Sequence, residues 1–381
     1  MLLYVFNPEH DYALANNDPH FMAPASAIRF ADECALFLQH LIEDDAIVFR
    51  PYQKKPFYSI LKGTSVDLPG KITDIRPWGW DKAIQLQMQL AGVPAESTLS
   101  TEKIEQYREL AHRKTASEAL QYLRNMLSNG EELPNPAEML TSLKEVETFT
   151  AKHEDVIFKS PYSSNGRGHL YAHKSCSPTL LRQAGGVIRR QGAIMAEKMY
   201  DVVQDFAMEF HCNNGNAVFS GYSLFSTMHY GYAGNLLWSD NAIEEHLCQW
   251  TTIESLHEIR QSILQFLQTK IAPFYHGYLG VDMFIYNDNG FKINPMVEIN
   301  LRMTMGMAAH LIYERHVHNE SVGELHLEYC PQGGELLRKA QKAHEEHPFT
   351  LKNGCWHSGF HSLTPIDETT QYAFFVLLHA L

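Results

Sequence analysis

Three oxygen-bearing side chains lie on a stretch that the sequence predicts to be a β-hairpin. Residues 281–299 contain two apolar runs rich in β-branched and aromatic residues, separated by the hairpin turn signal Asn-Asp-Asn-Gly. Asp282 lies in the first run, and alternation puts Glu298 and Asn300 on one face of the second. Pairing of the two strands would bring all three together. Such oxygens are ligands for hard cations such as Mg²⁺, which also bind phosphates.

Arg302 extends this group by one positive charge. It follows Asn300 by two residues and lies on the same side if the chain stays extended. A guanidinium there could stabilise charge on a transferring phosphoryl group. Taken alone, Asp282 and the Glu-x-Asn sequence are better explained as the polar side of an ordinary hairpin. The chemical interpretation therefore depends on what the rest of the chain supplies.

A second stretch carries a strand lysine followed by a loop of small residues. Lys159 ends a short apolar strand, and residues 163–168 read Ser-Ser-Asn-Gly-Arg-Gly. Serine and glycine let backbone N–H groups approach phosphate oxygens closely, and Arg167 can add charge. No Gly-Lys-Ser/Thr follows, so this is not a Walker P-loop. Alone, such a loop is most often a hairpin, but the preceding lysine favours a phosphate site.

Two acidic residues follow at a spacing suited to a nucleoside. A strand at 193–196 ends in Glu-Lys-Met-Tyr, and such a hinge can hold an adenine amino group through Glu197 and the backbone. Asp205 comes eight positions later and could bind ribose hydroxyls. Without their neighbours, both residues would be interpreted as a solvated strand edge.

The first 100 residues alternate strands and helices. Apolar strands at 2–6 and 46–49 and helical patterns at 25–42 and 81–91 predict a small parallel-sheet α/β domain. A polar loop at 7–11 directly follows the first strand, where open α/β sheets place ligand contacts. A plain Asx/Pro turn explains this loop equally well.

Bulk composition excludes several classes of protein. The chain has 381 residues, 45% of them hydrophobic, which predicts a globular protein of two or three domains. No run of 18 apolar residues and no signal-peptide pattern is present, so we expect no membrane span and no export. The net charge of −13 disfavours nucleic-acid and anionic-membrane partners. Six cysteines without a Cys-x-x-Cys pair favour a reducing cytoplasm over disulfides or structural zinc.

Two further features allow alternative interpretations. Residues 225–237 are rich in glycine and tyrosine and are typical either of a mobile flap over a site or of a structured loop. Cys355, His357 and His361 could be offered as metal ligands. One face of a strand explains their alternation better, so we do not interpret them as a metal site.

Taken in chain order, these residues resemble the ATP-grasp superfamily. The resemblance covers about residues 105–312, and it lies in the order of five motifs because no single motif is specific. The set comprises Lys114 (or Arg113) before the central domain, Lys159 with its loop, the hinge at 197–200, Asp205, and Asp282 with Glu298, Asn300 and Arg302. The resemblance implies an ATP-grasp fold of α/β and α+β parts. It comprises a pre-ATP-grasp α/β domain at 1–100, a central subdomain at 101–195 and a C-terminal subdomain at 196–381.

The resemblance also implies a role for each residue. In this family ATP lies between two α+β subdomains and the glycine-rich loop closes over its phosphates. Carried over, the nucleotide contacts would be Lys114, Lys159, Ser164, Asn165, Gly166, Arg167, Gly168, Glu197, Lys198, Tyr200 and Asp205. One or two Mg²⁺ ions, with Mn²⁺ as the alternative, would bind Asp282, Glu298 and Asn300. The catalytic cations would be Arg302 and Lys159.

The activity that the resemblance implies is ADP-forming ligation of a small-molecule carboxylate to an amine. Phosphorylation turns the carboxylate into an acyl phosphate, which an amine can attack, while Mg²⁺ and cationic side chains neutralise charge. The alternatives are a small-molecule kinase with the same nucleotide site and a nucleotide-binding protein without turnover. The loop at 7–11, residues 230–235 and Arg302 are candidate substrate contacts, and a homodimer is the default oligomeric state.

Three departures from the family pattern affect the hairpin. Leu301 replaces a proline that often follows the metal-binding asparagine, and Gly280 stands where some ligases have an arginine. Arg302 is therefore the main candidate for that arginine's role. The segment before Glu298 is about two residues longer than usual and contains Pro295. Because proline cannot donate to a sheet ladder, we predict a bulge there.

Overall fold

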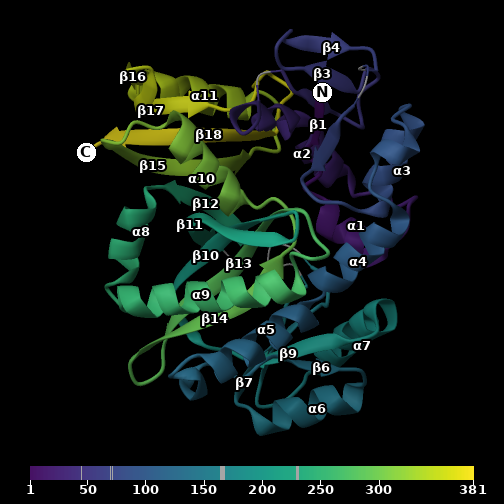
Figure 1. The fold of residues 1–381 in the computed structure, drawn as a ribbon, viewed down its shortest axis with the longest axis vertical. Helices are drawn as coiled ribbons and strands as arrows, with labels where there is room; N and C mark the ends of the chain where they lie inside the picture. Colours follow the sequence, from purple (N-terminus) through teal and green to yellow (C-terminus); the bar gives the residue numbers. More distant parts are fainter. Residues whose placement is uncertain (44, 69, 71, 164–167, 229–230) are drawn as a thin grey trace.

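A computed structural model of the protein describes residues 1–381 apart from 44, 69, 71, 164–167 and 229–230. Within the described residues the strands form three sheets, of five, nine and four strands. Figure 1 shows the four-stranded sheet at the opposite end of the molecule from the five-stranded N-terminal sheet. No helix in the described part of the chain combines the length and the apolar character needed to span a membrane.

The N-terminal sheet has the strand order β4-β3-β2-β1-β5. β1 (Leu2–Val5) pairs in parallel with β2 (Ile47–Phe49) and β5 (Asp74–Pro77), which confirms the predicted parallel sheet. Two short strands, β3 (Phe57–Ser59) and β4 (Thr64–Val66), add an antiparallel edge that was not predicted. The helices of this part are α1 (His10–Asn16), α2 (Ala25–Cys34), the 3₁₀ helix η1 (Ala35–His40), α3 (Lys82–Leu90) and the 3₁₀ helix η2 (Ala95–Ser97).

The charged helical segment that follows is two helices. α4 (Thr101–Ala111) and α5 (Arg113–Met126) are separated at His112, whose backbone is extended at φ −63° and ψ 135°. The His112 side chain accepts a hydrogen bond from the backbone N–H of Lys114 and so caps the second helix. The break places Arg113 in the first turn of α5.

The four-stranded sheet is antiparallel with the order β6-β9-β7-β8. Its elements are β6 (Glu138–Leu140), α6 (Leu143–Lys152), β7 (Asp155–Lys159), β8 (Leu170–His173), α7 (Pro178–Gln191) and β9 (Ile194–Lys198). Val156, Phe158 and Ile194 form its core with residues of α6 and α7. Ser177 caps α7 and Pro178 begins it, a combination that favours a helix start.

The nine-stranded sheet has the order β14-β13-β10-β11-β12-β15-β18-β17-β16. Its strands are β10 (Asp201–Asn213), β11 (Asn216–Met228), β12 (Gly231–Leu237), β13 (Gly277–Asn287), β14 (Phe291–Asn300), β15 (Ser321–Tyr329), β16 (Thr350–Lys352), β17 (Cys355–Ser362) and β18 (Tyr372–Ala380). The remaining helices are η3 (Gly130–Glu132), α8 (Asp240–Leu247), α9 (Ile253–Lys270), α10 (Met305–His316) and α11 (Glu335–Glu346). Most of residues 225–237, for which both a flap and a structured loop were considered, belong to the paired strands β11 and β12.

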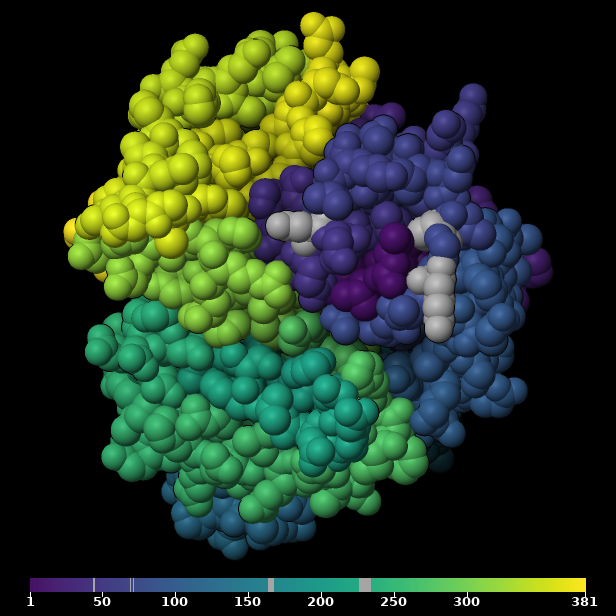
Figure 2. Space-filling model, turned by 45° about the horizontal axis from the view of Figure 1, so that its top comes forward, coloured from purple at the N-terminus to yellow at the C-terminus, as the bar shows by residue number. Residues whose placement is uncertain are grey.

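An aromatic core joins the N-terminal part to the C-terminal strands. The rings of Phe37 and Phe374 lie 4.3 Å apart, and the Phe6 ring lies 5.0 Å from that of Trp78. The backbone N–H of Met303 donates to the carbonyl of Trp78 at 2.8 Å. Figure 2 shows the N-terminal residues packed against the C-terminal ones on this face of the molecule. This contact places helix α1 beside the end of β14.

Candidate active site

The predicted hairpin positions three oxygen-bearing side chains on one face of the nine-stranded sheet. β13 and β14 pair antiparallel, with Asp282 opposite Glu298 and Gly280 opposite Asn300. The Asn300 side-chain amide donates a 2.9 Å hydrogen bond to Asp282. The convergence of these side chains, predicted from alternation, is therefore present in the structure.

The predicted bulge is also present. Asp282 pairs with Glu298 and Phe284 pairs with Asn294, so one residue of β13 faces three residues of β14. Pro295, which has no N–H to donate, lies inside this irregularity, and the Asn294 side chain accepts from the backbone N–H of Met296 at 3.2 Å. The bulge sets the register that brings Glu298 opposite Asp282.

The donor set suits a hard divalent cation. Burial and then the negative charge of Glu298 raise the pKa of Asp282 to about 7, although Asn300, Arg302 and Arg113 oppose the shift. A cation would relieve this repulsion. Among the described residues, no three His, Cys, Asp or Glu side chains form a metal-binding group by themselves. Two carboxylates and an amide oxygen, completed by water or phosphate, nevertheless fit Mg²⁺.

Arg113 lies in this site and Lys114 does not. The Arg113 guanidinium is 2.9 Å from Glu298 and donates to the Ser160 carbonyl at 3.0 Å and to Ser163 Oγ at 3.1 Å. Arg113 thus links the candidate metal carboxylate to the start of the small-residue loop. The side chain of Lys114 is 42% exposed and pairs with Glu109. Of the two candidate cations, the structure places Arg113 against the site.

Lys159, the lysine that precedes the small-residue loop, is buried at the end of β7. It forms an ion pair with Glu197, the hinge carboxylate, which reaches it from the neighbouring strand β9. Burial raises the pKa of Asp205, although the charge of Lys159 opposes the shift. Lys159 and Glu197 are therefore in direct contact, and Asp205 feels the charge of Lys159.

The structure describes three of the remaining predicted nucleotide contacts, Lys198, Tyr200 and Gly168. The Lys198 ammonium lies 5.5 Å from the centre of the Tyr200 ring, and that ring packs 4.6 Å from Tyr286 on β13. Gly168 has φ +83°, a conformation that favours glycine. The predicted contacts at Ser164, Asn165, Gly166 and Arg167 lie outside the described residues.

Arg302 is held by a residue of the N-terminal part. Its guanidinium lies 2.9 Å from Asp11 in the first turn of α1 and donates to Asn300 Oδ1 at 3.1 Å. Burial alone would lower the pKa of Arg302, but the charges of Asp11, Glu298 and Asp282 outweigh it and raise the pKa. Arg302 therefore stays charged, and residues 7–11 reach the site through Asp11.

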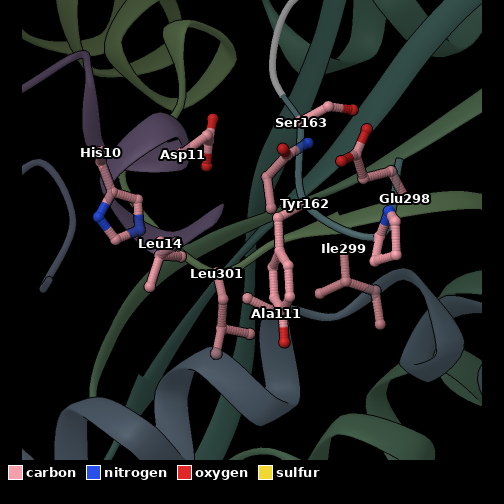
Figure 3. Close-up of a pocket in the computed structure, with 11 residues that line it drawn as sticks. His10, Asp11, Leu14, Ala111, Tyr162, Ser163, Glu298, Ile299 and Leu301 are labelled. Atoms are coloured by element: carbon pink, nitrogen blue, oxygen red, sulfur yellow. The ribbon is translucent and has the colours of Figure 1, made fainter. Parts of the chain in front are cut away.

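A pocket lies between these groups. It is lined by α1, the end of α4, residues 161–163 after β7 and residues 298–301 at the end of β14. Figure 3 shows Asp11 and Glu298 on opposite sides of this pocket, with the Tyr162 ring, Leu14 and Leu301 forming an apolar part below them.

Two residues near the site were not predicted. Glu209 on β10 is 1% exposed, accepts a 2.8 Å hydrogen bond from Thr304, and has its pKa raised to about 8 by burial. Ala207 is the residue of β10 that pairs with Asp282, and Glu209 lies two residues further along the same strand. This spacing was the one sequence feature that could have indicated that Glu209 lies near the site. His169 directly follows Gly168. Burial and then the charges of Lys159 and Arg113 lower its pKa to about 3, and its buried Nε2 has no partner among the described residues.

Comparison with solved structures identifies the fold, whereas comparison by sequence found nothing: no protein-family model and no curated protein matches the chain. A biotin carboxylase–β,γ-ATP complex from Campylobacter jejuni aligns at TM-score 0.52 and 10% identity, covering 100% of this chain and 87% of that one. The biotin carboxylase domain of Hydrogenobacter thermophilus 2-oxoglutarate carboxylase, with MgADP and bicarbonate, aligns at TM-score 0.51 and 11% identity, covering 81% and 71%. N5-carboxyaminoimidazole synthetase from Staphylococcus aureus aligns at TM-score 0.50 and 13% identity, covering 99% and 93%.

These neighbours are ATP-grasp proteins, and the alignments span nearly the whole chain in two of the three cases. The protein therefore has the ATP-grasp fold, with an N-terminal sheet that contains parallel strands and two largely antiparallel sheets. At such low identity the likeness establishes the fold alone.

Proposed function

We propose that the protein is an ATP-dependent, ADP-forming ligase that joins a carboxylate to an amine through an acyl phosphate. One observation carries this proposal: the paired carboxylates Asp282 and Glu298 face a site that also contains the cations Arg113, Lys159 and Arg302. Phosphoryl transfer asks mainly for positioning and for neutralisation of charge, and this is what such a site provides.

Each residue takes a part in the proposed reaction. Arg113 and Lys159 bind the phosphates, with the loop at 163–168 covering them. Glu197 and the backbone at Lys198 and Tyr200 hold adenine, and Asp205 holds the ribose. Asp282, Glu298 and Asn300 bind Mg²⁺, which polarises the phosphates when bound.

Arg302 would bind the carboxylate substrate and the acyl phosphate. The carboxylate oxygen attacks the γ-phosphorus, and the bond to ADP breaks. The amine nitrogen then attacks the acyl carbon, phosphate leaves, and the nitrogen loses a proton. Burial of Lys159 and Arg113 strengthens their attraction for phosphate relative to exposed cations.

The proposed enzyme consists of three domains. We place a pre-ATP-grasp domain at 1–100, a central subdomain at 101–195 and a C-terminal subdomain at 196–381. We propose one or two Mg²⁺ ions, replaceable by Mn²⁺, a cytoplasmic location, small-molecule substrates and no nucleic-acid partner, with a homodimer as the default assembly.

The test is ADP release from MgATP in a matrix of carboxylates crossed with amines. Bicarbonate is included because the Hydrogenobacter thermophilus structure holds it. We expect release that needs both a carboxylate and an amine, and loss of at least 100-fold in Glu298→Gln, on the order of what removing one charge-stabilising group costs. Glu346→Gln, on the exposed face of α11, is the matched control and should keep full activity.

Two outcomes would contradict the ligase. Release with one compound alone, giving a phosphorylated product, would favour a kinase. Equal turnover in Glu298→Gln and the wild type would show that the candidate metal site is not needed for the reaction.

A further inference from the structure

His169 lies where the chain leaves the small-residue loop and enters β8. The last antiparallel pair between β7 and β8 is Phe158 with Leu170. Continuing this register by one residue sets His169 across from Lys159, and residues opposite each other in an antiparallel pair project from the same face of a sheet. The imidazole therefore belongs to the face that carries the proposed phosphate-binding lysine.

Arg113 approaches the same place from α5. A side-chain carbon at Gly168 would lie 3.6 Å from Ser160 Oγ, so the two ends of the loop meet beside His169. The Ser160 carbonyl accepts a hydrogen bond from Arg113 at 3.0 Å. The positive charges of Lys159 and Arg113 both act on the His169 imidazole. His169 thus adjoins both cations to which the proposed function assigns the phosphates.

The His169 side chain carries an unused hydrogen-bonding atom. Its Nε2 is buried and has no partner among the described residues. The ring itself packs edge-on against Tyr171, with 6.5 Å between the ring centres. Buried side-chain polar atoms have a partner in the large majority of cases, so an unpartnered one indicates a missing ligand, water or ion. Beside two phosphate-binding cations, a phosphate oxygen is the ligand that fits.

Without a nucleotide, the surroundings of His169 oppose a positive charge. Burial lowers the pKa of His169 most, and the charges of Lys159 and Arg113 lower it further, to about 3. The acids beside these two cations are already paired with them, Glu197 with Lys159 and Glu298 with Arg113. The imidazole is therefore neutral in the free protein at physiological pH.

A bound nucleotide reverses these electrostatics. Its phosphates bring several negative charges to the two cations, and a phosphate oxygen at Nε2 accepts a hydrogen bond from the ring. A nearby opposite charge and a hydrogen bond to the charged form both favour that form, so the imidazole takes up a proton. The resulting bond between imidazolium and phosphate is charge-assisted and about twice as strong as a neutral one.

We infer that His169 binds a phosphate oxygen of the nucleotide through Nε2 and takes up a proton when the nucleotide binds. The inference rests on the proposed ATP-dependent activity and adds to it a further phosphate ligand and a dependence of nucleotide affinity on pH. Since binding consumes a proton, raising the pH must weaken it. The proton comes from solvent and returns there when the nucleotide leaves, so no other reactant is required.

Isothermal titration calorimetry with MgADP tests the inference. Titrations at pH 6 and at pH 8, each in two buffers of different ionisation enthalpy, give both the dissociation constant and the number of protons exchanged. His169→Gln keeps an N–H donor near the position of Nε2 but cannot take up a proton, and His169→Leu removes the donor as well. His173→Gln is the matched control, because His173 lies on the same strand with 62% of its side chain exposed.

At pH 6 the wild type should take up roughly half a proton or more beyond the count for His169→Gln. Taking this difference removes the protons that the nucleotide and all other groups exchange. His169→Gln should bind MgADP roughly tenfold more weakly than the wild type at pH 6 and within about threefold at pH 8. His169→Leu should bind more weakly than His169→Gln at both pH values, and His173→Gln should match the wild type in both measures.

Two results would overturn the inference while the ligase stands. One is an equal proton count in the wild type and His169→Gln, and the other is binding of MgADP to His169→Leu as tight as to the wild type at pH 6. Thermal unfolding shows whether each variant is folded, and the proton count of His169→Gln decides the inference even where His169→Leu fails to fold. A wild type that binds neither MgADP nor MgATP would instead contradict the proposed function itself, and the inference with it.

Discussion

At the scale of single residues, the site contains two ion pairs, each between a basic and an acidic side chain. Arg113 pairs with Glu298, and Lys159 with Glu197. In each pair the cation is a candidate phosphate ligand, and the acid is a candidate for the metal or the adenine. When a magnesium nucleotide binds, its phosphates would replace the acids as partners of the two cations, and its metal and adenine would become the partners of the acids. Each buried charge would then be compensated both before and after binding.

Substitution of the adjacent basic residues separates their roles. Arg113→Met should weaken MgADP binding on the order of 100-fold, because a buried cation against the phosphates is removed. Lys114→Met is the matched change one residue away and should alter binding less than threefold, because its exposed pair with Glu109 contributes little. Isothermal titration calorimetry measures both constants. Equal losses in the two variants would contradict the assignment of Arg113.

Glu209 predicts a pH dependence of stability. Burial raises its pKa in the folded protein from 4.5 to about 8, so the folded state holds a proton that the unfolded state releases. Its stabilising contribution is complete below about pH 4.5 and is lost as the pH rises through 8. Glu209→Gln mimics the protonated form and should gain stability relative to the wild type on the order of 4 kcal/mol between pH 5 and pH 9.

Urea denaturation of both proteins at the two pH values gives this difference. A stability gap between Glu209→Gln and the wild type that does not change with pH would show that Glu209 is ionised in the folded protein throughout. Comparing the two proteins at each pH removes the titration of all other groups from the result.

Residue types and spacing allowed part of this site to be predicted. Asp282, Glu298 and Asn300 were identifiable because strand alternation has a fixed period and a strong turn signal joins their strands. Residue spacing could not decide whether Arg113 or Lys114 faces the site, because this depends on where α4 ends and α5 begins. Glu209 and His169 were missed because their significance comes from burial, which only the tertiary packing defines.

At the scale of elements, the N-terminus of α10 is packed against β10 around Gly306. A side chain at Gly306 would meet the Glu209 carboxylate and Ser223, and one at Gly280 would lie 2.8 Å from both Glu209 and Thr304. Glu209 and Thr304 therefore fill the space that a side chain at position 280 would need.

Gly306→Ala should destabilise the protein by about 1–3 kcal/mol, the usual range for overpacking a buried site. Gly185→Ala on α7 is the control, because a methyl group there stays at 3.5 Å or more from its neighbours. That substitution should be neutral or stabilise the fold by up to about 1 kcal/mol. Chemical denaturation measures both changes, and a Gly306→Ala protein as stable as the wild type would contradict the packing described for α10.

Hydrophobic period and turn signals predicted the β13–β14 hairpin and the first strands and helices of the chain, but they failed at short or interrupted elements. The three-residue strands β3 and β4 are too short to show a period. The break between α4 and α5 leaves no mark in the sequence because His112 is compatible with a helix by composition, and only its cap and extended backbone reveal the end of α4.

At the scale of the whole molecule, the site draws on every part of the fold. The N-terminal part supplies Asp11, α5 supplies Arg113, the four-stranded sheet supplies Lys159 and Glu197, and the nine-stranded sheet supplies the candidate metal ligands. The order of motifs along the chain was sufficient to suggest the fold, which the solved structures confirm. The pairing of sheets across more than 200 residues could not be predicted, because no local pattern encodes which faces meet.

The most direct test of the central claim follows an oxygen atom. A carboxylate found active in the matrix is labelled with ¹⁸O and incubated with MgATP, its amine and the wild-type protein, and the released phosphate is analysed by mass spectrometry. An acyl-phosphate ligase transfers one carboxylate oxygen to each phosphate, so we expect one ¹⁸O per phosphate and one amide per ADP. Phosphate without the label, released together with the joined product, would show that no acyl phosphate forms and would contradict the mechanism.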